Sequence, residues 1–258
     1  MMPELVDSHC HLDFACFDDD RTALLAAAKQ QGVGAIVVPG VTASGWPALQ
    51  RLCQQHSALF PAFGLHPCFL DQHRQEDLHL LSELVSQAPV VAIGEIGLDL
   101  FDPQADLAAQ LSFLIPQLEL AKQRQLPVIL HVRKAHDQML QQLRRLQLAR
   151  GGIVHAFSGS LQQAEQYLQL GFRLGLGGGI TYLRANRLRK LVQTLPLGSF
   201  VLETDAPDMP LAGYQGQRNE PSRVRLVAEA LAGLKQCSLA EVAEVTTMTA
   251  RQVLKLAV

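Results

Sequence analysis

The stretch from residue 127 to residue 156, PVILHVRKAHDQMLQQLRRLQLARGGIVHA, contains the repeating unit from which the chain is built. It opens with a short apolar run that ends in His131, continues with a helix-period segment over 135–149, and closes with a second apolar run containing His155. Short apolar runs of this kind are typical of parallel strands that are covered on both faces. The pattern therefore predicts a strand, a helix and a second strand, with a histidine at or near the end of each strand.

The same alternation extends in both directions along the chain. The candidate strands are 4–8, 34–39, 59–64, 90–95, 127–131, 152–156, 172–177 and 199–203. The helix-period segments are 18–31, 45–57, 75–87, 104–125, 135–149, 161–170, 183–194, 222–234 and 238–256, the last opening with the capping sequence SLAE. Eight such alternations without a linker predict one α/β domain over residues 1–258, folded as a TIM-type (β/α)₈ barrel. An open, doubly wound sheet is the alternative fold.

Composition limits the classes of function. The chain of 258 residues is 48% hydrophobic and carries a formal net charge of −2, which argues against a dedicated nucleic-acid-binding module. A nuclease stays possible, because metal ions can supply positive charge where a phosphate binds. The 5 cysteines form no C-x-x-C pair and do not predict a disulfide framework. We find neither a signal-peptide pattern nor a long apolar run, and we expect a cytoplasmic protein with no membrane association and no obligate protein partner.

Side chains of metal-ligand type follow several of the predicted strands. His9 and His11 come directly after the first strand, and residues two apart in an extended segment point the same way. Alone, this pair would be explained better by two solvated histidines than by a metal site. Four more residues of ligand type lie at or near the ends of later strands, and these are Glu95, His131, His155 and Asp205.

In a TIM barrel these strand ends converge on the active-site mouth. Buried imidazoles and carboxylates without a partner are costly, so a shared cation explains their placement better than scattered polar residues would. The sequence therefore predicts a metal site. Its ligands would be His9, His11, Glu95, His131, His155 and Asp205. The histidines expected in helices or loops, which we interpret as solvated, are His56, His73, His79 and His136.

Three further residues are candidates for catalysis. Glu203 lies two residues before Asp205, and it either orients a ligand or water or pairs with a cation in the barrel interior. His66 follows the third strand and is interpreted as a substrate contact that stabilises developing charge. Arg133 either grips a phosphate or forms a surface salt bridge. The glycine-rich run at 173–179 fits no nucleotide-binding motif, and we expect it to let the chain pass close to the metals.

Seven short motifs in chain order resemble those of the TatD family of metal-dependent hydrolases, in the amidohydrolase superfamily. They are DSHCHLD, GLHP, GEIGLD, LHVR, HAFSG, ETDAP and NEP, and they extend from residue 7 to residue 221. The resemblance implies a TIM barrel and a deoxyribonuclease, often a 3′–5′ exonuclease, with the NEP motif fixing the long last loop. It also implies how the ligands divide. One cation would take His9, His11 and Asp205, the other His131 and His155, and Glu95 would bridge them.

One position departs from the family pattern. The usual form of the fourth-strand motif has an aromatic residue where this chain has Leu100, and Phe101 follows. The change leaves the predicted ligands intact and is expected to alter how substrate packs near the mouth.

The predicted chemistry is hydrolysis with two divalent cations, which could be Zn, Mn, Mg, Ni or Co. Paired cations lower the pKa of a bound water and generate a hydroxide nucleophile, for which Asp205 is the best general-base candidate. The first hypothesis is a phosphodiesterase acting on nucleic acid, plausibly a deoxyribonuclease. The second is a two-metal hydrolase of a small amide, lactone or phosphoester, which the scarcity of base-stacking residues (1 Trp and 3 Tyr) keeps open. A non-catalytic metal scaffold would require a broken ligand set.

Overall fold

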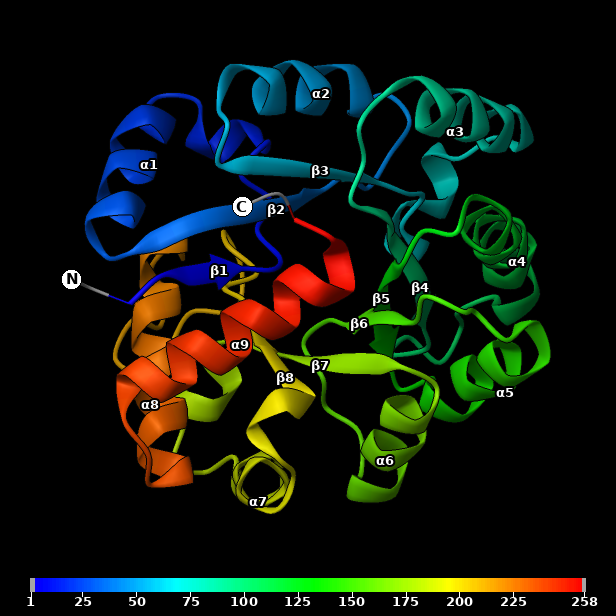
Figure 1. The fold of residues 1–258 in the computed structure, drawn as a ribbon. Coiled ribbons are helices and arrows are strands. Elements are labelled where there is room, and N and C mark those ends of the chain that lie inside the picture. The colour runs from blue at the N-terminus through cyan, green and yellow to red at the C-terminus, as the bar shows by residue number, and fades with distance from the viewer. Residues whose placement is uncertain (1–2, 257–258) are drawn as a thin grey trace.

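Eight parallel strands form one nearly closed sheet in the computed structural model, which describes residues 3–256 (Figure 1). They are β1 (Leu5–Asp7), β2 (Val33–Pro39), β3 (Leu59–Phe63), β4 (Ala92–Asp99), β5 (Val128–Arg133), β6 (Gly152–Val154), β7 (Phe172–Leu176) and β8 (Phe200–Leu202). Each strand pairs with the next in chain order. Ser8 N donates to Leu202 O at 2.9 Å, which joins the end of β1 to β8. The predicted TIM barrel is therefore confirmed, and the doubly wound alternative is wrong.

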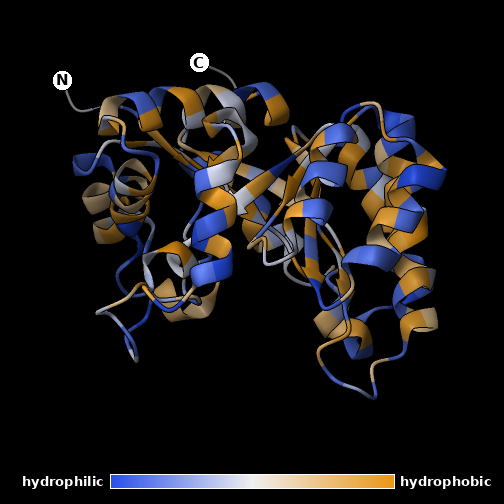
Figure 2. Cartoon of the chain, turned by 90° about the horizontal axis from the view of Figure 1, so that it is seen from below, coloured by the Kyte–Doolittle hydropathy of each residue, from blue (hydrophilic) through white to orange (hydrophobic). Residues whose placement is uncertain are grey.

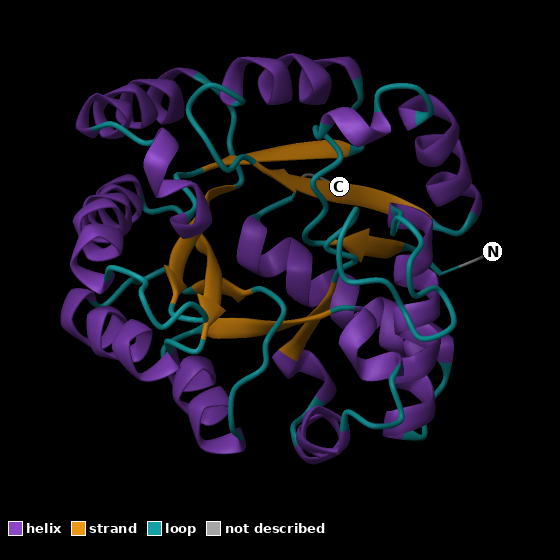
Figure 3. Cartoon of the chain, turned by 180° about the vertical axis from the view of Figure 1, so that it is seen from behind, coloured by secondary structure: helices purple, strands orange, loops and turns teal. Residues whose placement is uncertain are grey.

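Helices surround the strands, as the view from behind shows (Figure 3). They are α1 (Arg21–Gln30), α2 (Trp46–Gln55), α3 (Gln75–Gln87), α4 (Leu107–Arg124), α5 (His136–Leu146), α6 (Leu161–Gln169), α7 (Asn186–Thr194) and α8 (Val224–Lys235). The helix predicted from residue 104 begins later, because the Asp106 side chain accepts a hydrogen bond from Ala109 N at 3.0 Å and caps the first turn. The strands in the interior are mostly hydrophobic (Figure 2), as expected for a sheet covered on its outer face.

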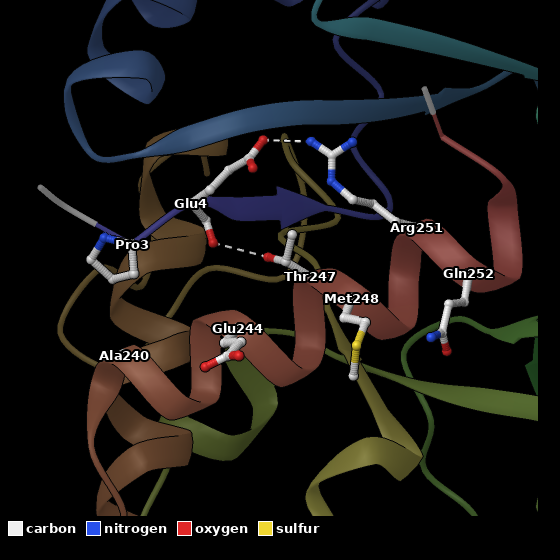
Figure 4. A pocket seen from close by; sticks show the side chains of 8 residues that line it. All are labelled: Pro3, Glu4, Ala240, Glu244, Thr247, Met248, Arg251 and Gln252. Atoms are coloured by element: carbon white, nitrogen blue, oxygen red, sulfur yellow. Dashed lines mark hydrogen bonds and ion pairs between the residues drawn. The ribbon is translucent and has the colours of Figure 1, made fainter. Parts of the chain in front are cut away.

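A ninth helix, α9 (Leu239–Leu254), crosses the end of the barrel at which the strands begin (Figure 1). It is tied to the start of β1. Thr247 Oγ1 donates to Glu4 O at 2.9 Å, and the Arg251 guanidinium lies 2.6 Å from a Glu4 carboxylate oxygen (Figure 4). Ala250 and Leu254 pack against buried residues of several strands. The helix closes this end, and the cavity of about 640 Å³ beside it lies away from the strand ends that carry the ligand-type side chains.

Strand β4 differs in one respect from the expectation. It was predicted to end at Glu95, but it continues to Asp99, and its pairing with β5 is irregular between Ile93 and Ile96. At this irregularity Glu95 N donates to Gly40 O at 3.1 Å, beyond the end of β2. Glu95 therefore lies within the strand, at the point where the regular ladder is interrupted.

Among residues 3–256, no helix has the length and apolar character needed to cross a bilayer.

Candidate metal centre

The six predicted ligands converge at one end of the barrel. They come from β4 and β5 and from the segments that follow β1, β6 and β8. Four of them, His9, His11, Glu95 and His155, are buried, with Glu95 only 1% exposed. The structure thus brings together side chains that are almost two hundred residues apart in sequence, as the ends of parallel barrel strands must.

A first group of ligand atoms surrounds one point. His9 Nε2 and His11 Nε2 lie 3.2 Å apart, and they are 3.1 Å and 3.4 Å from Glu95 Oε2. Asp205 Oδ1 is 3.7 Å from each of the two nitrogens. Two imidazole nitrogens bound to one tetrahedral ion at about 2.0–2.1 Å would be about 3.3 Å apart. The observed spacing of the two histidines fits shared coordination.

A second group faces the other oxygen of Glu95. Glu95 Oε1 lies 3.3 Å from His131 Nδ1 and 3.8 Å from His155 Nε2. His155 Nε2 is also 3.8 Å from Asp205 Oδ1. The two oxygens of Glu95 therefore face two different pairs of histidines, which is the arrangement that a bridging carboxylate requires.

His66 also contacts Glu95, and its hydrogen bonds define its tautomer. Its Nδ1 accepts a hydrogen bond from Cys68 N at 3.1 Å, while its Nε2 lies 3.2 Å from Glu95 Oε1. A neutral imidazole whose Nδ1 accepts must carry its proton on Nε2. Burial lowers the pKa of His66 and favours this neutral form. His66 is therefore arranged as a hydrogen-bond donor, whereas a ligand would need a free electron pair on Nε2.

The buried imidazoles and carboxylates shift one another's pKa values. Burial opposes ionisation of Glu95, but the neighbouring His66 and His9 outweigh it and hold the pKa of Glu95 well below its ordinary range. Burial likewise opposes protonation of His155 but is outweighed by the Asp205 and Glu203 carboxylates, which raise its pKa to about 10. Burial raises the pKa of Asp205 to about 6. The cluster therefore stabilises positive charge at its centre, and its imidazole and carboxylate donors fit divalent cations.

Comparison with known proteins agrees with this geometry. A family model described as TatD-related DNase matches residues 6–255. The chain belongs to the TatD family. It is 46% identical over 246 residues to the metal-dependent hydrolase YjjV of Escherichia coli K12, with 95% of each chain covered. It is 33% identical to the human deoxyribonuclease TATDN3, over 95% of this chain and 93% of the human protein. A crystal structure of E. coli YjjV superposes with a TM-score of 0.96 at 43% identity and covers both chains completely.

The family resemblance stated from the motifs is thereby confirmed, and the chain is a metal-dependent hydrolase of the TatD type.

Within this TatD fold, Glu203 is fully buried and accepts hydrogen bonds from His155 Nδ1 at 3.1 Å and from Ala156 N at 2.6 Å. Of the two roles considered for Glu203, this geometry matches the orientation of His155. With a proton held on Nδ1, His155 directs Nε2 into the site, where a bound cation would take the place of the second proton of the ring.

Two carboxyl groups that support residues of the TatD site were not predicted from the sequence. Asp99 Oδ2 lies 2.9 Å from His131 Nε2, so the ring is held from the side opposite Glu95. Asp7 is buried and accepts hydrogen bonds from Thr204 N at 2.9 Å and Thr204 Oγ1 at 2.6 Å. A signal for each was present, because Asp99 ends the GEIGLD motif and Asp7 opens DSHCHLD.

The long loop at 205–221 is fixed from its far end. Asn219 of the NEP motif is buried, and its Nδ2 donates to Thr204 O at 2.9 Å and to Met209 O at 3.3 Å. This agrees with the role that the family resemblance implied for the motif. Asp205, at the start of the loop, has a left-handed φ of 57°, which is strained for a non-glycine residue and is tolerated where surrounding contacts hold it.

The glycine-rich run makes room for Glu203. A Cβ added at Gly175 of β7 would lie 2.2 Å from a Glu203 carboxylate oxygen, far inside contact distance. The close approach that Gly175 allows is therefore to Glu203, the residue that orients His155, and not to one of the predicted ligands themselves.

Two of the histidines interpreted as solvated are buried, so that interpretation was wrong for them. His73 Nε2 pairs with His66 O at 2.8 Å and steadies the segment that carries His66. His136 Nδ1 lies 3.3 Å from Tyr167 Oη beneath α5. Both lie in predicted loops or helix starts, where sequence pattern does not reveal that a neighbouring element covers them. His79 is exposed, as expected.

A cavity of about 370 Å³ opens beside the ligand cluster. Its lining residues are His131, Val132, Arg133, His155, Ala156, Ser158, Asp205 and Met209. The Arg133 guanidinium lies on its rim, 3.9 Å from Asp99 Oδ2, and the side chain is 53% exposed. The site therefore has an entrance with a positively charged side chain at its edge.

Proposed function

We propose that this TatD family member, acting as a single barrel domain, hydrolyses phosphodiester bonds of DNA with two divalent cations. One cation would be held by His9, His11 and Asp205, and the other by His131 and His155. Glu95 would bridge them. The observation that carries the proposal is the division of the Glu95 oxygens, of which Oε2 faces His9 and His11 while Oε1 faces the second pair. Zn, Mn, Mg, Ni and Co are all compatible with this donor set.

When bound, such cations polarise a phosphoryl oxygen and lower the pKa of water towards neutrality. The chain would supply the proton acceptor. Asp205 Oδ1 faces three imidazoles at 3.7–3.8 Å, which places a carboxylate oxygen where it could take up the proton of an attacking water. The backbone of Asp205 is held in place by Asp205 N, which donates to His9 O at 2.8 Å.

Two further residues would act on the substrate. The Nε2 proton of His66 points into the cluster, so His66 would donate a hydrogen bond to a phosphoryl oxygen as negative charge develops there. Arg133 lies at the cavity rim and would bind a phosphate through the edges of its guanidinium. Glu203 would act indirectly, by holding the Nδ1 proton of His155 so that Nε2 of the ring faces a cation.

DNA as the substrate is supported by the relatives. The matching family model carries the description of a DNase, and the human relative is named a deoxyribonuclease. The net charge of −2 gives little general attraction for a polyanion, so binding would depend on charges at the mouth.

The test is a hydrolysis assay with protein reconstituted separately with each candidate cation. Substrates would be single-stranded DNA, duplex DNA and a panel of small phosphoesters, lactones and amides. We expect cleavage of DNA and a loss of about 10²- to 10⁴-fold in kcat for Asp205→Asn. Asp19→Asn makes the same chemical change on the exposed surface and serves as the control. Equal activity of Asp205→Asn and wild type would refute the mechanism. Turnover of lactones or amides without DNA cleavage would favour the small-molecule alternative.

A further inference from the structure

An exposed aromatic ring lies beside the entrance. Phe101 follows β4 and is 51% exposed. The Arg133 guanidinium carbon lies 3.6 Å from the centre of its ring, and Lys134 Nζ lies 4.6 Å from it. Both distances are those of cation–π contacts. One ring at the end of β4 thus contacts two positively charged side chains from the end of β5.

The ring and the ligand cluster are linked by a short chain of contacts. Arg133 Nη1 lies 3.9 Å from Asp99 Oδ2, and the same oxygen is 2.9 Å from His131 Nε2. Arg133 also lines the cavity that contains His131, His155 and Asp205. The guanidinium is therefore next to the place where the scissile phosphate would bind, but it does not contact the proposed bridge Glu95.

The stacking contact with Phe101 restricts the conformations of the Arg133 side chain. An exposed arginine samples many rotamers, and ordering it costs side-chain entropy. Stacking on Phe101 occupies a flat face of the guanidinium and restricts those rotamers. The N–H edges stay available, because the distance of 3.9 Å to Asp99 is too long for a hydrogen bond. Free edges on an ordered guanidinium are what bidentate binding of a phosphate requires.

The position of the aromatic residue in the chain matters. Leu100 packs against the core, whereas Phe101, one residue later, projects at the rim. An aromatic side chain at position 100 would point into the core and could not support Arg133 in this way.

We propose that Phe101 is a positioning residue that holds Arg133 as a clamp for the phosphate next to the scissile phosphodiester. This inference rests on the proposed function. It predicts that the enzyme favours oligonucleotides, which carry a neighbouring phosphate, over esters that contain a single phosphate.

The test compares wild type, Phe101→Ala, Phe101→Tyr, Arg133→Ala and the double variant Phe101→Ala/Arg133→Ala, all loaded with the same cation. Each is assayed on a short oligothymidylate and on bis(p-nitrophenyl) phosphate. We expect each alanine variant to raise KM for the oligonucleotide by on the order of tenfold, with a much smaller loss on the single-phosphate ester. The double variant should be no worse than Arg133→Ala, because Phe101 acts through Arg133. Phe101→Tyr should restore the wild-type KM.

A salt series gives a second readout. Removing the phosphate contact should lower the slope of log KM against log salt concentration by about 0.7 in both alanine variants. This is the value for one phosphate of a single strand. Leu80→Ala and Arg145→Ala remove an exposed apolar side chain from α3 and an exposed cation from α5, and both should behave as wild type.

The outcomes separate the two proposals. If wild type cleaves no phosphodiester with any cation, the proposed function fails and this inference fails with it. If wild type cleaves the oligonucleotide but Phe101→Ala keeps its KM, or if the two alanine substitutions are fully additive, only the role of Phe101 is refuted.

Discussion

His155 and Glu203 form a buried pair in which the imidazole Nδ1 lies 3.1 Å from Glu203 Oε1. Glu203 comes from the segment after β8 and His155 from the segment after β6, so the contact passes over β7, which lies between them. The carboxylate also accepts a hydrogen bond from Ala156 N at 2.6 Å, which fixes the backbone beside the ring. The orientation of His155, one of the predicted ligands, is thus fixed by a protein side chain.

Glu203→Ala should therefore weaken cation binding without removing a ligand. Loss of such a supporting partner typically lowers metal affinity by about 10- to 100-fold. The affinity can be measured by competition with a fluorescent chelator. Glu229→Ala, which removes a half-exposed glutamate from α8, is the control. An unchanged affinity in Glu203→Ala would show that His155 does not depend on its partner.

Gly175→Ala should disturb the same pair from the opposite side. The new Cβ would lie 2.2 Å from Glu203 Oε2, so the carboxylate must move away from His155. We expect lower cation affinity and a lower melting temperature. Gly233→Ala in α8 meets no described atom within 4 Å and should stabilise the protein by up to about 1 kcal/mol. Identical melting temperatures and affinities in Gly175→Ala and wild type would contradict the close approach.

Asn219→Ala should loosen the loop at 205–221. The variant loses hydrogen bonds to Thr204 O and Met209 O and leaves the buried carbonyl of Thr204 without this partner, which costs about 1–3 kcal/mol. Hydrogen exchange should become faster in this loop and remain unchanged in the helix α3. Uniformly faster exchange across the barrel would instead indicate a general loss of stability.

His136 predicts a pH dependence that is separate from the metal centre. Burial lowers its pKa from 6.5 to about 4, so the unfolded chain binds more protons than the folded chain between these values. The free energy of unfolding should therefore fall as the pH decreases from about 6.5 towards 4, by at most about 3 kcal/mol from this residue. Above pH 6.5 its contribution is complete.

The measurement is urea unfolding in EDTA across this pH range, for wild type, His136→Asn and the exposed-site control His79→Asn. The wild type and His79→Asn should share the slope, and His136→Asn should have a shallower one. Parallel curves for all three proteins would rule out His136 as the source.

Some features of the fold and of the site could be predicted from the sequence, and others could not. The difference lies in the physical rule that determines each feature. The strand ends of parallel βα units must meet, so His9, Glu95, His131 and His155 could be assigned to one mouth from spacing alone. The irregular pairing that extends β4 past Glu95 has no signal in hydrophobic period, because apolar residues, Ile93 and Ile96, lie on both sides of it.

Side-chain partners were harder to predict than positions. Whether a histidine at the start of a helix is solvated depends on what packs over it, and for His136 this is Tyr167, thirty-one residues later in the chain. The stacking of Arg133 on Phe101 likewise depends on side-chain direction at the ends of two adjacent strands. Sequence spacing placed Arg133 at the mouth but did not distinguish a phosphate clamp from a surface ion pair.

The number of divalent cations bound per chain tests the central claim most directly. The protein would be dialysed against each candidate cation and analysed by elemental mass spectrometry, with Glu95→Ala and the control Glu83→Ala treated in parallel. We predict two cations per chain in wild type and Glu83→Ala, and a clear loss in Glu95→Ala because both groups of histidines share this carboxylate. A wild-type protein that binds none, or a Glu95→Ala variant that retains both, would contradict the account.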